Sequence, residues 1–420
     1  MSAVARMRSR VSGVGPAGVA SRAGWAGVVE ILQLVNAVLV FVILANLLGA
    51  ANYGRLVAVL ALAGPAVSLT NLGSHVLLIK RVSQGTQFSE AWHRATSIGL
   101  IGPTIGALIL IAAQPIILDN VDRWSFALLL LSQGVFFWFT ELAVYVGNAT
   151  HRFKEAAQIR LMVLACRLVA LAWFAVAGDG QLMAWAVASF AAFALGAVMA
   201  LLFVRVNFGS WASLRHGQWS DVREGVPYSL NSAPETLFDA SDKWLLARYD
   251  LLVDAGIYGL GARIVQFGYL PLRIIMRASD RDLFAAGRHG VASAMEVTAS
   301  LMRPAVAASI AIAAGLAVLA PVVPLVAGSE YEAAVDAIRL LALLPLIRGI
   351  QWLLGNCLSA SDHQWWRVGA TASAAALNVA LNVSLLPTGS WRTAIFTTMV
   401  SELYLTGVLA LIITYWMWTE

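Results

Sequence analysis

The sequence predicts an all-α integral membrane protein with about twelve transmembrane helices. Hydrophobic residues make up 60% of the 420 residues and charged residues only 12%, whereas about 25% of the residues in soluble domains are charged. The mean hydropathy is +0.76. No polar stretch is long enough for a separate soluble domain. Soluble packing could not hide this much apolar surface, so we expect the helices to lie in lipid.

The expected spans are apolar runs of about 20 residues, and glycine and proline punctuate the connections between them. They cover residues 25–47, 55–79, 95–118, 124–147, 156–177, 182–204, 227–249, 255–277, 299–326, 333–358, 366–386 and 393–416. This division predicts a short N-terminal segment, a first group of six helices, a linker and a second group of six helices, at residues 1–24, 25–206, 207–226 and 227–420.

Lysine and arginine are concentrated in one alternating set of connections, which includes Arg6, Lys80 and Arg223. The opposite set is acidic and includes Asp119 and Glu330. The positive-inside rule assigns the basic set to the cytoplasm, and an even number of spans then puts both termini there as well. The six histidines are scattered among separate connections, so we expect no metal site.

The most informative charges lie in the expected span 255–277, which carries Arg263, Gln266, Arg273 and Arg277. At roughly 100° per residue, these four side chains project from one side of a continuous helix. A charge at the bilayer centre costs at least ~2.5–3.5 kcal/mol. We therefore expect the stripe to face an aqueous cavity that suits an anionic substrate. There are two alternatives to substrate binding. Arg263 could pair with acids of the preceding span, and Arg277 could anchor the cytoplasmic edge of its helix.

The preceding span carries Glu235, Asp239, Asp242 and Lys243. The spacing places the three acids on one helix face, and Lys243 can pair with Asp239 one turn away. One interpretation is a protonatable or cation-binding cluster that couples transport to an ion gradient. The other is a set of ion pairs that fixes this helix to the arginines of the next one.

Other charges inside the spans are expected to form structural ion pairs between neighbouring helices. Glu141 of the fourth span faces Arg160 and Arg167 of the fifth, and Arg348 of the tenth faces Glu402 of the twelfth. A role for Arg160 in phosphate capture is the alternative in the first case. Arg348 lies deep in its span and is also a candidate for substrate binding.

Asn378 and Asn382, one turn apart in the eleventh span, are expected to bond to neighbouring helices rather than to substrate. The sequence contains no phosphate-binding loop, no histidine–glutamate zinc motif and no nucleophile elbow. We therefore expect no enzymatic activity, no catalytic residue, no metal and no cofactor.

A weak internal repeat links the two groups of six spans. Leu44-Ala45 matches Leu246-Ala247, and Gly54 matches Gly256, both at an offset of 202 residues. Six spans is an even number, so a duplicated half would enter the membrane in the same orientation. The repeat thus predicts two parallel, pseudo-symmetric six-helix lobes around a central cleft.

Several short motifs, in order, resemble those of the polysaccharide-biosynthesis flippases of the O-antigen Wzx type. This family belongs to the multidrug/oligosaccharidyl-lipid/polysaccharide exporter superfamily. The matching segments are Leu44-Ala45-Asn46-Leu47-Leu48-Gly49 with Tyr53-Gly54, Asn71-Leu72-Gly73, Asp242-Lys243-Trp244-Leu245-Leu246-Ala247-Arg248 with Gly256-Ile257-Tyr258, Leu319-Ala320-Pro321 with Gly328 and Tyr331, Leu377-Asn378 with Leu381-Asn382, and Ser401-Glu402-Leu403. Asn71 stands where the family commonly has an acid, so no acid of the second helix is available for ion coupling.

The resemblance implies a flippase of the bacterial inner membrane that moves an undecaprenyl-pyrophosphate-linked oligosaccharide from the cytoplasmic to the periplasmic leaflet. Alternating access between two lobes would carry the pyrophosphate past the arginines, whose planar guanidinium groups suit phosphate geometry. Expected partners are the lipid-linked oligosaccharide, membrane lipids, and polymerase or chain-length proteins of surface polysaccharide synthesis, but no nucleic acid. The alternatives are a small-molecule or drug exporter of the same superfamily and a non-transporting membrane partner of a polysaccharide synthase.

Overall fold

The computed structural model describes the backbone of residues 16–214 and 216–419. Within this range it describes the side chains from residue 40 onward, except those of residues 231, 277, 278, 280 and 281. The described residues form helices and short connections and contain no β-strand, so the predicted all-α class is confirmed. Eight helices among them are long and apolar enough to cross a membrane.

The helices follow one another closely along the chain. Those before the 209–218 connection are α2 (Pro16–Thr70), α3 (Ser74–Ser83), α4 (Phe88–Ile117), α5 (Arg123–Leu130), a π-helical segment (Leu131–Phe136), α6 (Phe137–Ala149), α7 (Phe153–Ala177) and α8 (Leu182–Phe208). Those after it are α9 (Trp219–Arg248), α10 (Leu252–Phe267), α11 (Leu270–Gly287), α12 (Val291–Leu319), α13 (Val323–Ala327), α14 (Glu332–Leu341), α15 (Leu344–Ala360), α16 (Gln364–Leu385) and α17 (Trp391–Thr419).

Two expected spans, 25–47 and 55–79, lie within the single long helix α2 and its successor α3. The backbone leaves the helical conformation at Gly49, where φ is +70°, a value that glycine adopts without a steric penalty. The predicted boundary between these two spans is therefore correct, because the helix is interrupted at Gly49. The end of the second span is wrong, because α2 ends at Thr70 and the chain turns before α3 begins at Ser74.

The expected span 255–277 is interrupted: α10 ends at Phe267, and α11 begins at Leu270 after a turn at Gly268 and Tyr269. Pro271 has no backbone N–H and cannot bond to the carbonyl of Phe267, which favours this break. Pro345 has the same effect between α14 and α15. The premise that Arg263 to Arg277 lie on one uninterrupted helix is therefore wrong.

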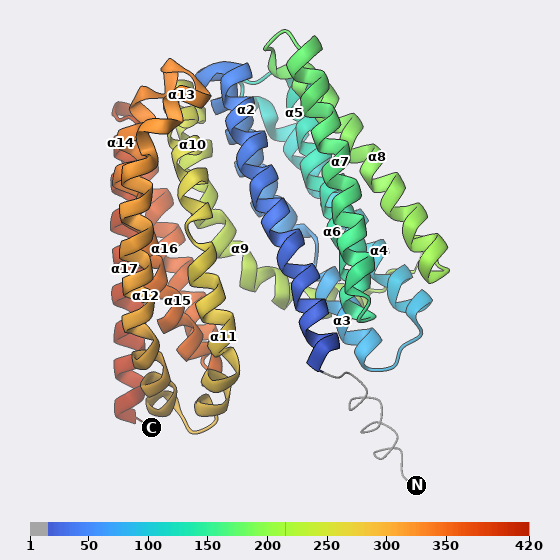
Figure 1. The fold of residues 1–420 in the computed structure, drawn as a ribbon, viewed down its shortest axis with the longest axis vertical. Coiled ribbons are helices and arrows are strands. Elements are labelled where there is room, and N and C mark those ends of the chain that lie inside the picture. Colours follow the sequence, from blue (N-terminus) through green and yellow to red (C-terminus); the bar gives the residue numbers. More distant parts are fainter. Residues whose placement is uncertain (1–15, 215, 420) are drawn as a thin grey trace.

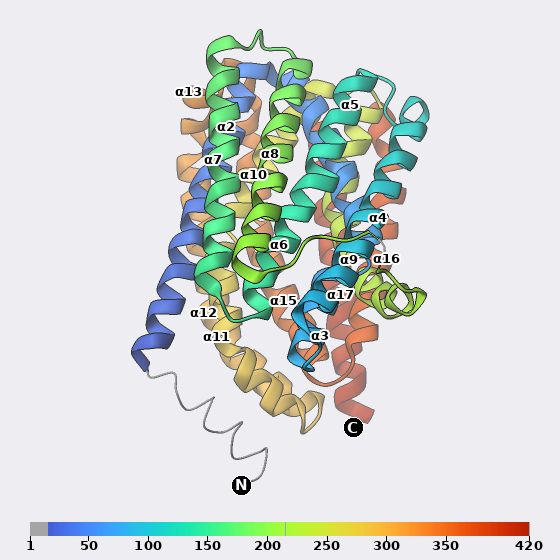
Figure 2. The same cartoon turned by 90° about the vertical axis from the view of Figure 1, so that its right-hand side faces the viewer.

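Figure 1 shows how the helices are arranged. Helices α10, α12, α14 and α17 lie on one side and α4, α7 and α8 on the other, with α2 running between them. Helix α2 packs against both sides, because it contacts α9 and α10 as well as α4 and α7. Figure 2 shows α3, α11 and the C-terminus at one end of the molecule and α13 and the start of α5 at the opposite end.

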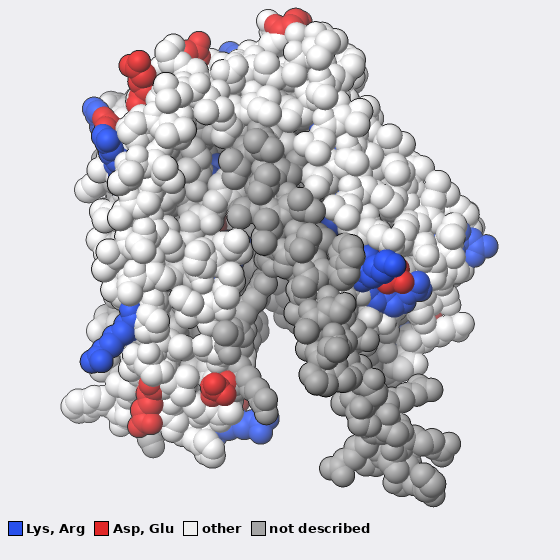
Figure 3. Space-filling view, viewed as in Figure 1, with Lys and Arg blue, Asp and Glu red and all other residues white. Residues whose placement is uncertain are grey.

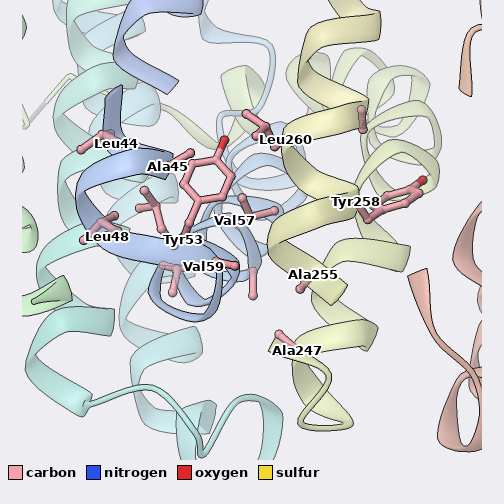
Figure 4. Packing of buried hydrophobic residues seen from close by; sticks show 14 of the residues in the cluster. Leu44, Ala45, Leu48, Tyr53, Val57, Val59, Ala247, Ala255, Tyr258 and Leu260 are labelled. Carbon is pink, nitrogen blue, oxygen red and sulfur yellow. The ribbon is translucent and has the colours of Figure 1, made fainter. Parts of the chain in front are cut away.

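A close contact between the first and second groups of helices involves a pair of glycines at the repeat offset. A Cβ added to Gly54 of α2 would lie 1.9 Å from the carbonyl oxygen of Leu252. A Cβ added to Gly256 of α10 would lie 2.2 Å from that of Ala50. Ala50 and Leu252 are themselves 202 residues apart, so the two contacts are equivalent under the repeat. Figure 4 shows this packed region, with Tyr53 pointing from α2 toward α10 and Tyr258 pointing away from α2.

The outer surface fits a lipid environment. Figure 3 shows a face that is mostly uncharged, on which lysine, arginine, aspartate and glutamate gather in small groups toward the two ends. Large apolar side chains such as Ile109, Val176 and Leu325 are exposed, by 62%, 89% and 84%. Such exposure is unfavourable in water and favourable in hydrocarbon. The chain is therefore a multi-pass membrane protein.

Candidate functional site

A cationic pocket lies where α2, α9 and α10 meet. Its volume is about 170 Å³, and Arg263 and Gln266 of α10 form part of its wall with Phe41 and Tyr53 of α2. Asp239 and Lys243 of α9 complete the polar lining. The pocket draws its residues from both sides of the molecule, because α2 belongs to the first group of expected spans and α9 and α10 to the second.

Arg263 has no compensating carboxylate among the described residues. Its Nη1 donates a hydrogen bond to Oε1 of Gln266 at 3.2 Å, and its guanidinium carbon lies 4.1 Å from the centre of the Phe41 ring. Its Nε is buried and has no hydrogen-bond partner in the described part of the chain, as is also true of the Tyr53 hydroxyl. A partly buried guanidinium with unused donors has the charge and geometry that suit an anion.

A second arginine approaches from the other side of the molecule. Arg167 of α7 lies near enough to Arg263 for their charges to repel each other. Its guanidinium carbon is 5.3 Å from the centre of the Phe193 ring, and its buried Nε has no partner within the described residues. No carboxylate of the described residues pairs with either arginine, so within this part of the chain their positive charge is uncompensated.

The predicted role of Arg167 as the ion-pair partner of Glu141 is corrected by the structure. Glu141 of α6 pairs instead with Arg160, with 3.4 Å between Oε2 and Nη2. Both arginines line a cavity of about 280 Å³ beside α6, but Arg167 projects seven residues further along α7. The π-helical segment Leu131–Phe136 immediately precedes α6 and changes its register, which sequence periodicity did not reveal.

The remaining members of the predicted arginine stripe do not share the pocket. Arg273 lies beyond the break, on α11, is exposed, and has its guanidinium carbon 5.8 Å from the centre of the Trp352 ring. The side chain of Arg277 lies outside the described residues. Of the stripe, the structure brings together Arg263 and Gln266.

Arg348 of α15 contacts two carboxylates. Its Nε donates to Oε1 of Glu402 on α17 at 2.7 Å, and its Nη2 bonds to both Glu402 and Asp239 of α9. Gln351 donates a hydrogen bond to the backbone carbonyl of Glu402 at 2.7 Å. The expected Arg348–Glu402 contact is thus present, and Asp239 joins it. Arg348 does not line the Arg263 pocket.

The three acids of α9 that were predicted to share one face, Glu235, Asp239 and Asp242, do not form one cluster. Asp242 is buried and accepts hydrogen bonds from Tyr258 and Thr398, while Nζ of Lys243 lies 3.4 Å from its Oδ1. Nζ of Lys243 also donates to the backbone carbonyl of Asp239, so the predicted Lys243–Asp239 carboxylate pair is corrected.

Glu235 is exposed and lies at the rim of the cavity that contains Arg348. Each of these three acids therefore has its own set of neighbours. Their helix spacing suggested a common face, but Asp242 bonds to α10 and α17 and Asp239 bonds to Arg348 of α15.

Asn378 and Asn382 bond to neighbouring helices as predicted. Ser241 of α9 donates to Oδ1 of Asn378 at 2.7 Å, and Thr397 of α17 donates to Oδ1 of Asn382 at 2.6 Å. The sequence analysis named Tyr53 and Tyr258 only as motif residues and did not name Arg367, although all three face the polar interior. Charged or hydroxylated residues within apolar runs were the signal that could have found them.

The fold is that of a known class of transporter. A multidrug resistance MATE family transporter of the MOP superfamily, in an inward-facing conformation, matches with a TM-score of 0.72, 13% identity, and coverage of 92% of this chain and 95% of that one. The lipid II flippase MurJ in an inward closed conformation matches with a TM-score of 0.69, 11% identity, and coverage of 92% and 87%. An outward-facing MATE transporter matches less well, with a TM-score of 0.56, 13% identity, and coverage of 91% and 95%.

The family follows from the sequence itself. The polysaccharide biosynthesis protein family matches residues 19–277, which is more than half of the chain, and this protein belongs to that family. No curated protein sequence matches the chain significantly. The protein is therefore a polysaccharide-biosynthesis family member with the fold of MOP superfamily transporters.

Proposed function

We propose that this protein is a flippase for an undecaprenyl-pyrophosphate-linked oligosaccharide, which it moves from the cytoplasmic to the periplasmic leaflet of a bacterial inner membrane. The observation that carries the proposal is the guanidinium of Arg263, which no acid of the described residues compensates, in a pocket between the two groups of helices. A pyrophosphate diester supplies the missing negative charge, and its prenyl tail stays in lipid while the headgroup passes through the protein.

In this proposal twelve crossings form two six-helix lobes, and both termini lie in the cytoplasm. The repeat-related glycine contacts support such lobes, because they act as a pseudo-symmetric contact about which the halves can rock. The better match to an inward-facing than to an outward-facing relative supports an inward-facing state. Arg263 and Arg167 then receive the pyrophosphate from the cytoplasmic leaflet, and rocking of the lobes exposes it to the opposite side.

The test is flipping of a fluorescent, pyrophosphate-linked glycolipid in liposomes that contain the purified protein. We expect Arg263→Gln to reduce the rate at least tenfold, because a charge-assisted hydrogen bond contributes about 1.5–3 kcal/mol. Arg263→Lys should retain part of the activity, since it keeps the charge but not the planar fork. Arg273→Gln should have a much smaller effect, because Arg273 lies outside the pocket.

Arg392→Gln is the matched control. Arg392 is exposed, and its contact with Asp336 is long, with 3.9 Å between Nη2 and Oδ2. Unchanged flipping in Arg263→Gln would remove this residue from the mechanism. Transport of an organic cation instead of the glycolipid would favour an exporter, and no transport by correctly folded protein would favour a partner of a synthase.

A further inference from the structure

A second cavity, of about 130 Å³, lies among α9, α15, α16 and α17 and contains an unbalanced set of charges. Two carboxylates, from Asp239 and Glu402, share the single guanidinium of Arg348. The side chains of Glu402 and Arg348 are 1% and 13% exposed, and that of Asp239 is 35% exposed. Two acids against one arginine leave an excess negative charge that burial makes costly.

The other groups around Glu402 do not remove this excess. The Tyr269 ring lies 5.5 Å from the guanidinium carbon of Arg348 and contributes a neutral hydroxyl. Gln351 and Thr406 are neutral. On the cavity wall, Arg367 bonds to Asn356 and Ser359, and the carboxylate of Glu235 is exposed. Lys243 contacts Asp239 only at its backbone carbonyl, and its ammonium group pairs with the carboxylate of Asp242. Within the described residues, Arg348 is the one cation that bonds to the side-chain carboxylates of Asp239 and Glu402.

One oxygen of Glu402 is left without a partner. Oε1 receives both contacts from Arg348, whereas Oε2 is buried and has no hydrogen-bond partner in the described part of the chain. Glu402 lines the cavity, which is large enough for several water molecules, since one water needs ~10–15 Å³. A proton on Oε2 would neutralise the excess charge, and the cavity would connect it to water.

We propose that Glu402 carries an exchangeable proton and that Asp239 links this proton to the substrate anion. This inference rests on the proposed function, because the anion is the pyrophosphate headgroup bound at Arg263. It replaces the expected coupling cluster of Glu235, Asp239 and Asp242 with Glu402, Asp239 and Arg348.

Asp239 makes the link because it belongs to both sites. Its carboxylate bonds to Arg348 in the Glu402 cavity, and the residue also lines the Arg263 pocket. An anion in that pocket repels the two carboxylates and favours uptake of a proton by Glu402. Linkage is reciprocal, so protonation of Glu402 must strengthen anion binding by the same factor. Release of the headgroup then releases the proton.

A proton fits this site better than a metal ion. The guanidinium of Arg348 already occupies the space between the two carboxylates and would repel a metal cation placed beside it. No group of three or more potential metal ligands is found among the described residues. A proton adds to one oxygen and needs no coordination shell.

The experiment measures proton uptake when the purified full-length protein binds a soluble, short-chain prenyl-pyrophosphoryl sugar. This probe is a diester, so its own charge does not change near neutral pH. Titration calorimetry in two buffers of different ionisation enthalpy gives the number of protons exchanged. We expect the wild type to take up a proton on binding and to bind up to roughly tenfold more tightly per unit fall in pH.

Glu402→Gln mimics the protonated acid and should bind the probe with no proton uptake and no pH dependence. Asp239→Asn leaves one acid for one arginine and should bind more tightly, again without proton uptake. Asp336→Asn removes an exposed acid that lines neither cavity and should behave as wild type.

Failure of this inference is distinct from failure of the proposed function. Arg263-dependent binding without proton uptake by the wild type, or with uptake that survives both acid substitutions, would overturn the inference alone. Dependence of binding on sodium at fixed pH would also overturn it. Absence of Arg263-dependent binding at any pH would overturn the proposed function.

Discussion

Arg348 and Arg263 are both partly buried arginines inside the helix bundle, and their surroundings differ in one respect. Arg348 contacts two carboxylates, from Asp239 and Glu402. Arg263 contacts an amide and an aromatic ring, with no carboxylate among the described residues. Both side chains lose hydration, but only Arg348 recovers charge pairing from the protein itself.

This difference suggests opposite roles for the two arginines, because the number of neighbouring acids sets the charge that each site lacks. Arg348 has an excess of acids, and we propose that its site takes up positive charge in the form of a proton. Arg263 has no acid partner among the described residues, and in the proposed function its site binds the negative charge of a ligand. Asp239 lies on the wall of both cavities and connects the two opposite imbalances.

The largest expected effect on stability distinguishes the two arginines when each is replaced by methionine. Arg348→Met leaves two carboxylates without a counter-charge and should lower the free energy of unfolding by about 3–5 kcal/mol. Arg263→Met should leave it nearly unchanged or raise it, because it removes a charge that no acid compensates. Thermal unfolding in detergent measures both. Equal destabilisation by the two substitutions would show that Arg263 has an acid partner after all.

A third arginine site, outside the spans, sharpens the comparison because two arginines share one buried acid. Asp221 at the start of α9 bonds to Arg81 of α3 and Arg94 of α4, and also accepts from the Gln218 backbone N–H at 3.0 Å. Burial alone would raise the pKa of Asp221, but the hydrogen bonds from Arg94 and Gln218 and the two positive charges lower it overall.

Asp221→Asn should therefore lower the free energy of unfolding at neutral pH by about 1.5–3 kcal/mol. A lowered pKa means that the stabilisation is complete above the unfolded value of about 3.9 and disappears as the pH falls through the lower folded value. Denaturation of both proteins between neutral and acidic pH checks this. A stability difference that already shrinks between pH 7 and 5 would contradict the prediction.

The smallest of the three effects on stability concerns the close contact between α2 and α10, two helices that line the Arg263 pocket but not the Arg348 cavity. In Gly256→Ala the new methyl group meets the carbonyl of Ala50 and pushes α10 away from α2. We expect a loss of about 1–3 kcal/mol of stability and weaker binding of the pyrophosphate probe, with Glu402 still protonatable. Gly64→Ala on α2 has open space around it and is the control. Equal effects of the two substitutions would argue against close packing at Gly256.

Much of the fold could be predicted because it depends on local composition and on periodicity. The apolar runs identified the membrane class, and Gly54 and Gly256 identified the repeat whose members meet at the interface. The break at Gly268 is not predicted, although Pro271 favours it, because the long apolar run around it indicates one continuous helix. That break separates Arg263 from Arg273 and reduces the predicted stripe to one arginine and one glutamine.

The sequence by itself determined that this chain lies in a membrane as helices, that it contains a repeat, and that its interior holds more charge than lipid would tolerate. Hydrophobicity and spacing along one helix are properties of neighbouring residues, so the sequence displays them directly. The tertiary structure decided which charges meet: Asp239 with Arg348 rather than Lys243, Glu141 with Arg160 rather than Arg167, and Arg263 with no acid in the described residues. Those pairings depend on the distance between side chains of different helices, and that distance is fixed only when the helices pack.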